Sequence, residues 1–166
     1  MPMDKSVFIV MGVSGTGKTT IGKLLAEALK LPFFDGDDFH PEENILKMSA
    51  GQPLNDSDRE GWLIALNELA IAHQSDGAII ACSALKEKYR QVLSSGIKDN
   101  IQFIFLEASF EQIKQRMQQR KNHFMPIELL QSQFDTLEVP TEAIQVNVIQ
   151  STHAIVNQVL NQINKV

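Results

Sequence analysis

The sequence contains a single cysteine among its 166 residues, so an internal disulfide cannot form. Its Cys and His residues show no zinc-type spacing, and we predict no zinc site. No apolar run approaches the ~20 residues that a membrane-spanning helix needs. The sequence passes almost directly from Met1 into an apolar run at Val7, and we expect no signal peptide. These absences favour a cytoplasmic location and predict no membrane partner.

The sequence also has no excess of basic residues. The chain has 15 Lys and Arg against 20 Asp and Glu, a net charge of −5. Nucleic-acid-binding domains usually present a basic face, so we expect no nucleic-acid partner. The hydrophobic fraction of 43% and the charged fraction of 21% are ordinary for a globular chain. The length and the lack of a repeat or linker predict one domain over residues 1–166.

What the sequence does contain is a glycine-rich phosphate-binding motif. The apolar run Val7 to Met11 leads into G-x-x-x-x-G-K-[ST], with Gly12, Gly17, Lys18 and Thr19 at the fixed positions. The N–H groups of such a loop, with the helix N-terminus that follows, form a nest for phosphate oxygens. The lysine reaches the β- and γ-phosphates and the threonine hydroxyl binds Mg²⁺. The alternative is a strand-to-helix turn without a ligand. The predicted nucleotide-binding residues here are Gly12, Val13, Ser14, Gly15, Thr16, Gly17, Lys18, Thr19 and Thr20.

Apolar patterning predicts alternating strands and helices along the whole chain. The unbroken apolar run Ala78 to Cys82 is typical of a strand buried on both faces of a parallel sheet. The alternation indicates an α/β layer fold with a mainly parallel sheet. Ligands bind at the carboxyl ends of such strands, so residues 12–19, 35–38 and 82–86 should meet around one cleft. Other predicted strands are 33–34, 101–106 and 144–149. Predicted helices are 21–29, 42–49, one that is capped within 55–58 and reaches about 73, 83–95, 110–120, 127–134 and 152–163.

Longer motifs add a family resemblance. They are Met11 to Thr19, Asp35 to Asn44, Lys47 to Asp56 with Asp58, Arg59 and Trp62, Cys82 to Lys86 with Tyr89 and Arg90, and Arg120 to Phe124. From about Phe8 to Pro140 the sequence resembles the gluconokinase family, small P-loop kinases that phosphorylate D-gluconate on its 6-hydroxyl with ATP. The resemblance implies a three-layer fold of the nucleoside-monophosphate-kinase type with a five-stranded sheet. It also implies a lid at about 117–135, a substrate-binding insertion at about 38–60, ATP and Mg²⁺ as cofactors, and a homodimer.

Two carboxylates follow the second predicted strand. No acidic residue ends the strand at 78–82, where a Walker-B acid normally lies, so Asp35 is the candidate that joins Thr19 as a metal ligand. Asp37 lies two residues further on, and in extended backbone it would point the same way. Similarity to shikimate kinase, which has an Asp-x-Asp at this position, implies that Asp37 orients the acceptor hydroxyl and accepts its proton. The alternative is that these residues form a turn.

Gluconate carries a carboxylate and five hydroxyls, so its pocket should combine a cation with hydrogen-bonding groups. Arg59 is the leading partner of the carboxylate, because a guanidinium matches it bidentately. Its alternatives are a solvated charge or an ion pair with Glu60 or Asp56. Further substrate-binding candidates are Lys86 and Arg90, which lie four apart on a predicted helix, and His40 and Asn44, which only the resemblance supports. Solvated or capping roles remain open for all four.

Arg116 and Arg120 lie beside the apolar stripe of a predicted helix near the lid. The resemblance implies that they clamp nucleotide phosphates or stack on adenine. An exposed basic face is the alternative. Cys82 ends a buried strand and is expected to pack as a small apolar side chain.

The resulting hypothesis is an ATP-dependent gluconokinase, with Lys18 and Asp37 as the catalytic residues. One alternative is a sister P-loop kinase with another acceptor, such as shikimate. Another is a nucleotide-binding switch without catalysis, although the Asn-Lys-x-Asp segment that reads guanine in GTPase switches is absent from the sequence.

Overall fold

The computed structural model describes residues 6–52, 54–119 and 127–163. The elements alternate as the apolar patterning predicts. In chain order they are β1 (Val7–Met11), α1 (Lys18–Leu29), β2 (Phe33–Asp35), the 3-10 helix η1 (Gly36–Phe39), α2 (Glu42–Ser49), α3 (Asp56–Ala72), β3 (Ala78–Ala81), α4 (Glu87–Ser94), β4 (Ile101–Glu107), α5 (Phe110–Gln119), α6 (Ile127–Thr136), β5 (Ile144–Asn147) and α7 (Thr152–Ile163).

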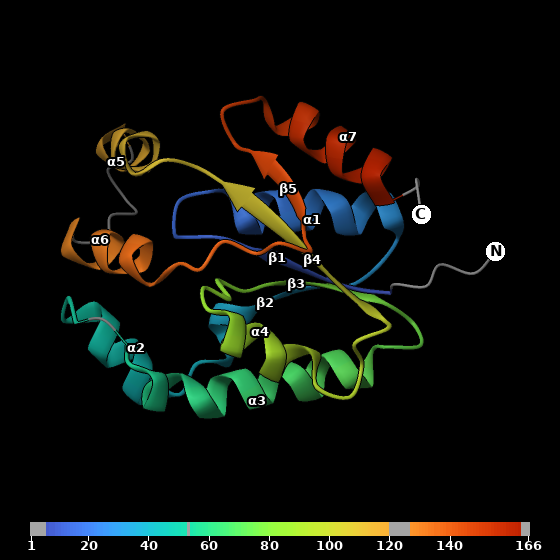
Figure 1. The fold of residues 1–166 in the computed structure, drawn as a ribbon, viewed down its shortest axis with the longest axis horizontal. Coiled ribbons are helices and arrows are strands. Elements are labelled where there is room, and N and C mark those ends of the chain that lie inside the picture. Colours follow the sequence, from blue (N-terminus) through green and yellow to red (C-terminus); the bar gives the residue numbers. More distant parts are fainter. Residues whose placement is uncertain (1–5, 53, 120–126, 164–166) are drawn as a thin grey trace.

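The strands form one five-stranded sheet in the order β2-β3-β1-β4-β5, as Figure 1 shows. All four pairings are parallel, which confirms the predicted parallel sheet. β1 occupies the centre, where Val7 pairs with Ala78 of β3 and with Ile101 of β4. β5, whose sequence alternates between apolar and polar residues, lies at an edge. The phosphate-binding loop therefore leaves the sheet from its most protected strand.

Alternate residues of β1 face two separate cores. Ile9, on one face of the strand, packs with Trp62 and Leu66 of α3. Val10, on the other face, packs with Leu25 of α1. All of these side chains are buried. Figure 1 shows the same three layers, with α1 and α7 above the sheet and α3 and α4 below it. No helix in the described part of the chain is long and apolar enough to span a membrane.

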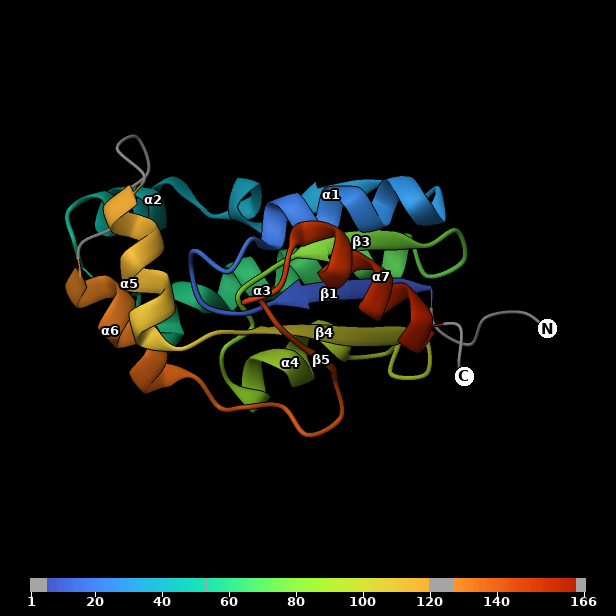
Figure 2. The ribbon, with the colours of Figure 1, turned by 90° about the horizontal axis from the view of Figure 1, so that it is seen from above.

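Three helices gather beyond the carboxyl ends of the strands. Seen from above in Figure 2, α2, α5 and α6 all lie past the end of the sheet where β1 and β4 terminate. The sequence begins α5 with the predicted capping box, because the Ser109 N–H donates to Gln112 Oε1 at 2.8 Å and the Gln112 N–H donates to Ser109 Oγ at 3.2 Å. These helices place side chains from distant parts of the sequence over the phosphate-binding loop.

The predicted helix over residues 83–95 begins later than expected, at Glu87. Ala84 has a φ of 47°, in the left-handed region, and Lys86 is extended with φ −110° and ψ 149°. The apolar pattern misled here because Leu85 is buried in a loop, where its carbonyl accepts a hydrogen bond from the Glu138 N–H at 2.7 Å. Lys86 therefore does not share a helical face with Arg90, and that prediction is wrong.

Candidate active site

The loop between β1 and α1 has the backbone that a phosphate nest requires. Gly12, Gly15 and Gly17 have φ values of 147°, 86° and 93°, which residues with a Cβ rarely adopt. A Cβ on Gly15 would also lie 2.8 Å from Ile113 Cγ2 of α5. The buried Thr16 hydroxyl donates to Val13 O at 2.9 Å and braces the turn from inside. The loop then ends in the N-terminus of α1.

The Lys18 side chain lies against this loop. Its ammonium donates to Gly12 O and to Val13 O, each at 3.0 Å. Loss of surrounding water lowers the pKa of Lys18, while the negative charge of Asp37, the strongest of its charged neighbours, opposes that change. A positive charge that has lost water interacts strongly with an incoming anion. The arrangement suits a phosphate oxygen placed beside the ammonium.

Asp35 forms the turn that the sequence offered as one alternative, and its carboxylate also contacts Thr19. It is the N-cap of η1, and its Oδ1 accepts a hydrogen bond from the Asp37 N–H at 3.0 Å. Its Oδ2 accepts one from the Thr19 hydroxyl at 3.1 Å. Because β2 ends at Asp35 and a helical turn follows, the expectation that extended backbone aligns Asp35 with Asp37 is wrong.

Asp37 belongs to η1 and faces Lys18 across a cavity of about 160 Å³. Surrounding protein raises the pKa of the Asp37 carboxyl, and the Lys18 ammonium opposes that rise. The Asp37 side chain is 83% exposed, so water moderates both effects. The carboxyl therefore lies at the mouth of the cavity with the lysine deeper inside.

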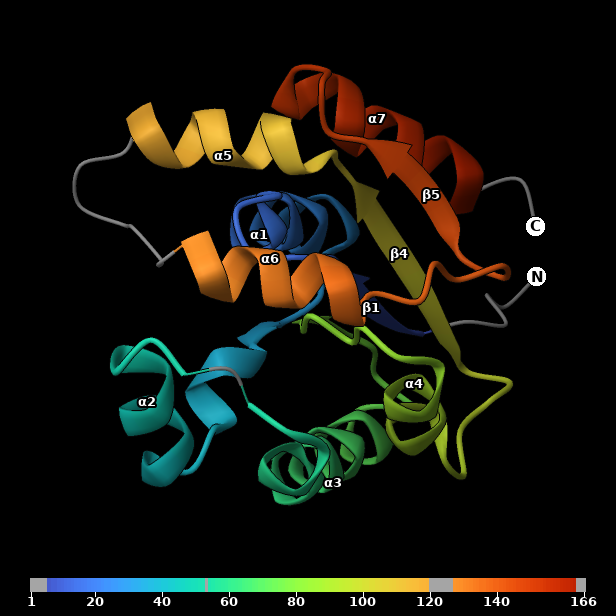
Figure 3. The same cartoon turned by 60° about the vertical axis from the view of Figure 1, so that its left-hand side comes forward.

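The cavity is built from segments that lie far apart in the sequence. Figure 3 shows α5 and α6 on one side of the end of β1, with α2 and α3 on the other. A larger cavity of about 310 Å³ lies beside α4 and the start of β4, but no residue of the phosphate-binding loop lines it. The smaller cavity is lined by Ser14, Lys18, Asp37, His40, Met48, Leu54, Arg59, Trp62, Ser83, Leu85, Leu129, Ser132 and Gln133.

The hydrogen bonds around His40 fix its protonation pattern. The Asn44 Nδ2 group donates to Asp58 O at 2.8 Å, which identifies that atom as the amide nitrogen. The same nitrogen lies 3.2 Å from His40 Nδ1, so Nδ1 accepts and the proton of the neutral ring is on Nε2. His40 Nε2 lies 4.0 Å from Asp37 Oδ1. His40 therefore presents an N–H donor beside the catalytic candidate.

The ring of His40 is also held by packing. It stacks on Trp62 with ring centroids 4.0 Å apart and an interplanar angle of 17°. The Trp62 Nε1–H donates to Gly36 O at 2.8 Å, which ties α3 to the turn that carries Asp37. A Cβ on Gly36 would lie 2.4 Å from Ala81 O, so the close approach of this turn to β3 requires glycine.

Burial of His40 makes stability depend on pH in a defined window. The His40 side chain is 4% exposed, and burial together with the Arg59 charge lowers its pKa to about 4. The unfolded chain, with the ordinary pKa of 6.5, binds the proton first as the pH falls. The stabilisation is therefore complete above pH 6.5 and is lost between pH 6.5 and 4, by about 3 kcal/mol.

We therefore expect the unfolding free energy of the wild type to fall more steeply over this window than that of His40→Gln, measured by urea titration at a series of pH values. The lowered pKa values of Asp56 and Asp58 act below this window. The raised pKa of Asp37 acts in both proteins and largely cancels in the comparison. Parallel pH profiles for the two proteins would contradict the assignment.

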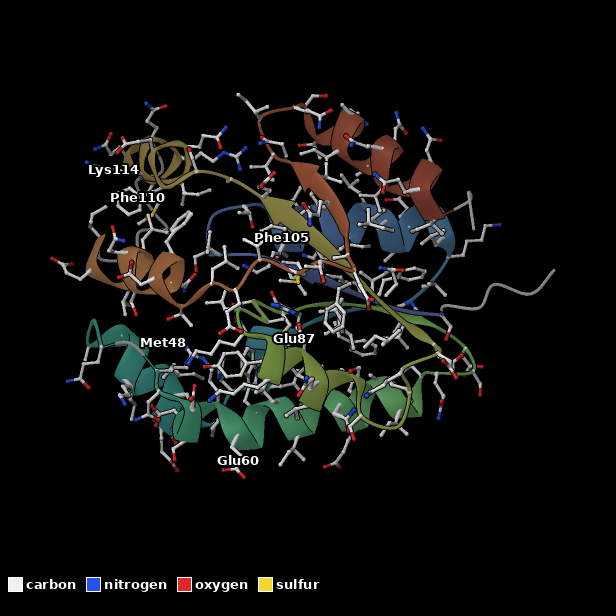
Figure 4. All side chains as sticks on the ribbon, in the orientation of Figure 1. Met48, Glu60, Glu87, Phe105, Phe110 and Lys114 are labelled. Atoms are coloured by element: carbon white, nitrogen blue, oxygen red, sulfur yellow. The ribbon has the colours of Figure 1, made fainter. Side chains whose placement is uncertain are left out.

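Arg59 reaches the cavity from the first turn of α3. Its Nη1 donates to Leu54 O at 2.7 Å and to the Tyr89 hydroxyl at 3.0 Å, and both bonds hold the guanidinium in place. Glu60 and Asp56, the two possible ion-pair partners, do not bind the guanidinium. Glu60 lies on the outer side of α3 (Figure 4), and Asp56 pairs instead with Lys86, Lys88 and the Tyr89 hydroxyl.

Lys86 and Arg90 do not line the cavity. The Lys86 ammonium lies 3.3 Å from Asp56 Oδ1. The Arg90 side chain is 5% exposed and donates to Ala84 O at 2.7 Å and to Glu138 O at 2.9 Å, so it supports the loop that follows β3. The positions of both residues favour structural roles over substrate binding.

Arg116 lies on the other side of the loop. Its Nη1 donates to Gly15 O at 3.1 Å and its Nη2 to Val148 O at 2.8 Å, so it joins the phosphate-binding loop to the segment after β5. Arg120 lies outside the described residues. Cys82 is buried as expected, and burial raises the pKa of its thiol to about 12, which leaves it unreactive.

Several residues of the cavity were not predicted to belong to the site. Met48, Trp62 and Ser83 lie within the family motifs, so the motifs could have indicated them. Ser132 and Gln133 lie on the predicted helix at 127–134, but nothing local shows that they face the loop. Only the packing of α6 brings these two residues there.

Comparison with known proteins agrees with this geometry. Residues 14–165 match the Shikimate kinase family. The chain is 40% identical to the thermoresistant gluconokinase of Escherichia coli (strain K12) over 168 residues, which covers 98% of this chain and 95% of that protein. It is 39% identical to the gluconokinase of Arabidopsis thaliana, over 95% of this chain and 92% of that one.

Solved structures give the same result. A gluconokinase from Sinorhizobium meliloti 1021 superposes with a TM-score of 0.89 at 41% identity, covering 99% of this chain and 94% of that chain. A shikimate kinase from Aquifex aeolicus shares the fold, with a TM-score of 0.59 at 17% identity and 96% coverage of each chain. The resemblance read from the sequence motifs is thereby confirmed, and the chain belongs to the gluconokinase family of P-loop kinases.

Proposed function

We propose that this protein transfers the γ-phosphoryl group of ATP to the 6-hydroxyl of D-gluconate, giving ADP and 6-phospho-D-gluconate. The observation that carries the proposal is that Lys18 and Asp37 face one another across a single cavity, each the strongest charged neighbour of the other among the described residues. Phosphoryl transfer requires mainly positioning and charge neutralisation, and these two groups supply them from opposite sides.

The acceptor lies between Asp37, His40 and Arg59. Asp37 orients the 6-hydroxyl and accepts its proton as the hydroxyl oxygen bonds to the γ-phosphorus. The bond from the γ-phosphorus to the bridging oxygen breaks, and the electron pair stays on ADP. The Nε2–H of His40 binds a substrate hydroxyl, and Arg59 binds the carboxylate through the part of its guanidinium that Leu54 and Tyr89 do not engage.

The nucleotide lies in the loop from Gly12 to Thr20. The amides of the loop and Lys18 bind its phosphates, and the Arg116 guanidinium lies where the loop meets Val148, on the side of the base. Arg120 belongs to the proposed nucleotide site on the strength of the family motif alone. We assign Asn44 an indirect role, because the two N–H donors of its amide are engaged by His40 Nδ1 and Asp58 O.

Thr19 in the first turn of α1 and Asp35 at the end of β2 fit Mg²⁺. Thr19 Oγ1 and Asp35 Oδ2 lie 3.1 Å apart and are the hard oxygen ligands that this ion prefers. Among the described residues no group of three or more His, Cys, Asp or Glu side chains could hold a metal. A site with few protein ligands is typical of Mg²⁺ shared with a nucleotide. When bound, the ion neutralises charge on the β- and γ-phosphates.

The remaining assignments complete the proposal. The chain functions as one kinase domain, with residues 38–60 as the substrate-binding insertion and residues 117–135 as the lid. Within the insertion, the Lys47 ammonium of α2 lies 2.6 Å from Asp58 Oδ2 in the first turn of α3. The proposal includes a cytoplasmic location and a homodimer, which the family resemblance implies, and no membrane or nucleic-acid partner.

A coupled assay that follows ADP release tests the function. Purified protein with ATP and Mg²⁺ is offered D-gluconate, other sugar acids, shikimate and nucleoside monophosphates in parallel. Turnover on gluconate with little on the other acceptors is expected. Turnover on shikimate alone would reject gluconate as the acceptor, and a protein that binds ATP without turnover on any acceptor would be a nucleotide-binding switch.

A further inference from the structure

The lid helix α6 makes a two-point contact with the phosphate-binding loop. The Ser14 N–H donates to Gln133 Oε1 at 2.7 Å, and Gln133 Nε2 donates to Ser14 Oγ at 3.0 Å. The two residues are 119 positions apart in the sequence. Both line the cavity that contains Lys18 and Asp37. A side chain of α6 therefore engages the backbone and the hydroxyl of the same loop residue.

The directions of these two bonds follow from chemistry. A backbone N–H can only donate, so the amide oxygen of Gln133 must face Ser14 N. The amide nitrogen then faces Ser14 Oγ, which accepts. A serine hydroxyl has one hydrogen to donate, and this contact leaves that hydrogen available for another acceptor. Gln133 thus sets the Ser14 hydroxyl as a hydrogen-bond donor.

The side of the loop on which Ser14 lies indicates what it meets. The next residue, Gly15, turns its carbonyl to Arg116 and the segment around Val148, away from the acceptor cavity. Ser14 instead shares the cavity with Lys18 and Asp37, between which the transferred phosphoryl group passes in the proposed reaction. The developing negative charge on that group is an acceptor for a hydroxyl donor placed there.

We infer that Gln133 is a positioning residue for phosphoryl transfer, which acts by holding the Ser14 hydroxyl as a donor to the transferred phosphoryl group. The inference rests on the proposed kinase function. It also links the seating of α6 to catalysis, because Ser14 is oriented only when α6 lies against the loop. The side chain does not carry the packing of α6, since Leu129 and Leu130 are buried and Phe134 packs edge-on against Phe110. Figure 4 shows Phe110 between α5 and α6.

The test compares Gln133→Met, Ser14→Ala and the double variant with the wild type. Methionine keeps the length of glutamine but removes both hydrogen bonds. We expect Gln133→Met to lower kcat by about tenfold to a hundredfold, with the KM for ATP and for gluconate nearly unchanged. Ser14→Ala should do the same, and the double variant should be no slower than either single one. Gln131→Met is the matched control, because Gln131 is exposed on the same helix and bonds only Asp135 among the described residues.

Each outcome supports or overturns the inference that Gln133 positions the Ser14 hydroxyl. Equal losses in the single and double variants, with unchanged melting temperatures, support the inference. A Gln133→Met variant with normal kcat overturns it, and so does a double variant in which the two losses multiply. If the wild type turns over a different acceptor, gluconate is rejected as the substrate but the inference on Gln133 is not. The same variants are then compared on that other acceptor. Normal wild-type turnover with insensitive variants rejects the inference but not the function.

Discussion

Replacement of Asp37 by asparagine is expected to lower kcat by about a hundredfold or more while the affinity for ATP stays close to that of the wild type. The asparagine amide keeps the shape of the carboxyl but cannot accept the proton of the 6-hydroxyl. The substitution also removes the negative charge that most favours the charged form of Lys18. The phosphates of bound ATP place negative charge beside the ammonium instead, so ATP binding should persist. The coupled assay measures kcat, and calorimetric titration measures ATP affinity.

The neighbouring Asp38 provides the control. It is exposed in the same turn but does not line the cavity, so Asp38→Asn should retain nearly full turnover. Gluconate binding to both variants can be followed by fluorescence, because Trp62 is the single tryptophan and lines the cavity. If Asp37→Asn retained wild-type turnover, the proton acceptor would have to be another group and the proposed geometry would be wrong.

Replacement of Lys18 by methionine should be at least as damaging, with kcat lower by about a hundredfold to a thousandfold. Methionine preserves the unbranched length of the side chain but removes the charge and the donors that face the phosphate. Folding should survive, because burial already disfavours the charged form of Lys18. Turnover and the melting temperature are the two measurements.

Lys23 on the same helix is the matched position. It is exposed and outside the cavity, so Lys23→Met should leave turnover intact. A Lys18→Met protein that is folded but inactive, beside an active Lys23→Met protein, would assign the loss to the phosphate site. An active Lys18→Met protein would show that the loop amides suffice and would remove Lys18 from the catalytic assignment.

The phosphate-binding loop was predictable because its determinants are local. Three glycines with positive φ, a lysine and a threonine lie within eight consecutive residues, and the apolar strand before them fixes their place at the end of the sheet. The sheet was predictable for a similar reason, since alternating layers leave few arrangements for five parallel strands.

The acceptor side was predicted less completely, because its contacts are non-local. Gln133 reaches Ser14 across 119 positions, and no short motif encodes that meeting. Lys86 was misplaced because a buried Leu85 has the same spacing in a loop as in a helix. The roles of Asp35 could not be separated from sequence, and the structure shows why: one carboxylate oxygen caps η1 and the other accepts from Thr19.

The central position of β1 has a consequence for motion. A strand flanked by β3 and β4 and buried against both cores opens only with the global unfolding of the molecule, whereas peripheral helices belong to units that open at lower cost. The floor of the nucleotide site thus belongs to the slowest-exchanging part of the protein, and α2 and α6 to its periphery. Substrates can enter and leave by local opening at one end of the sheet, without any loosening of the frame that holds the phosphates.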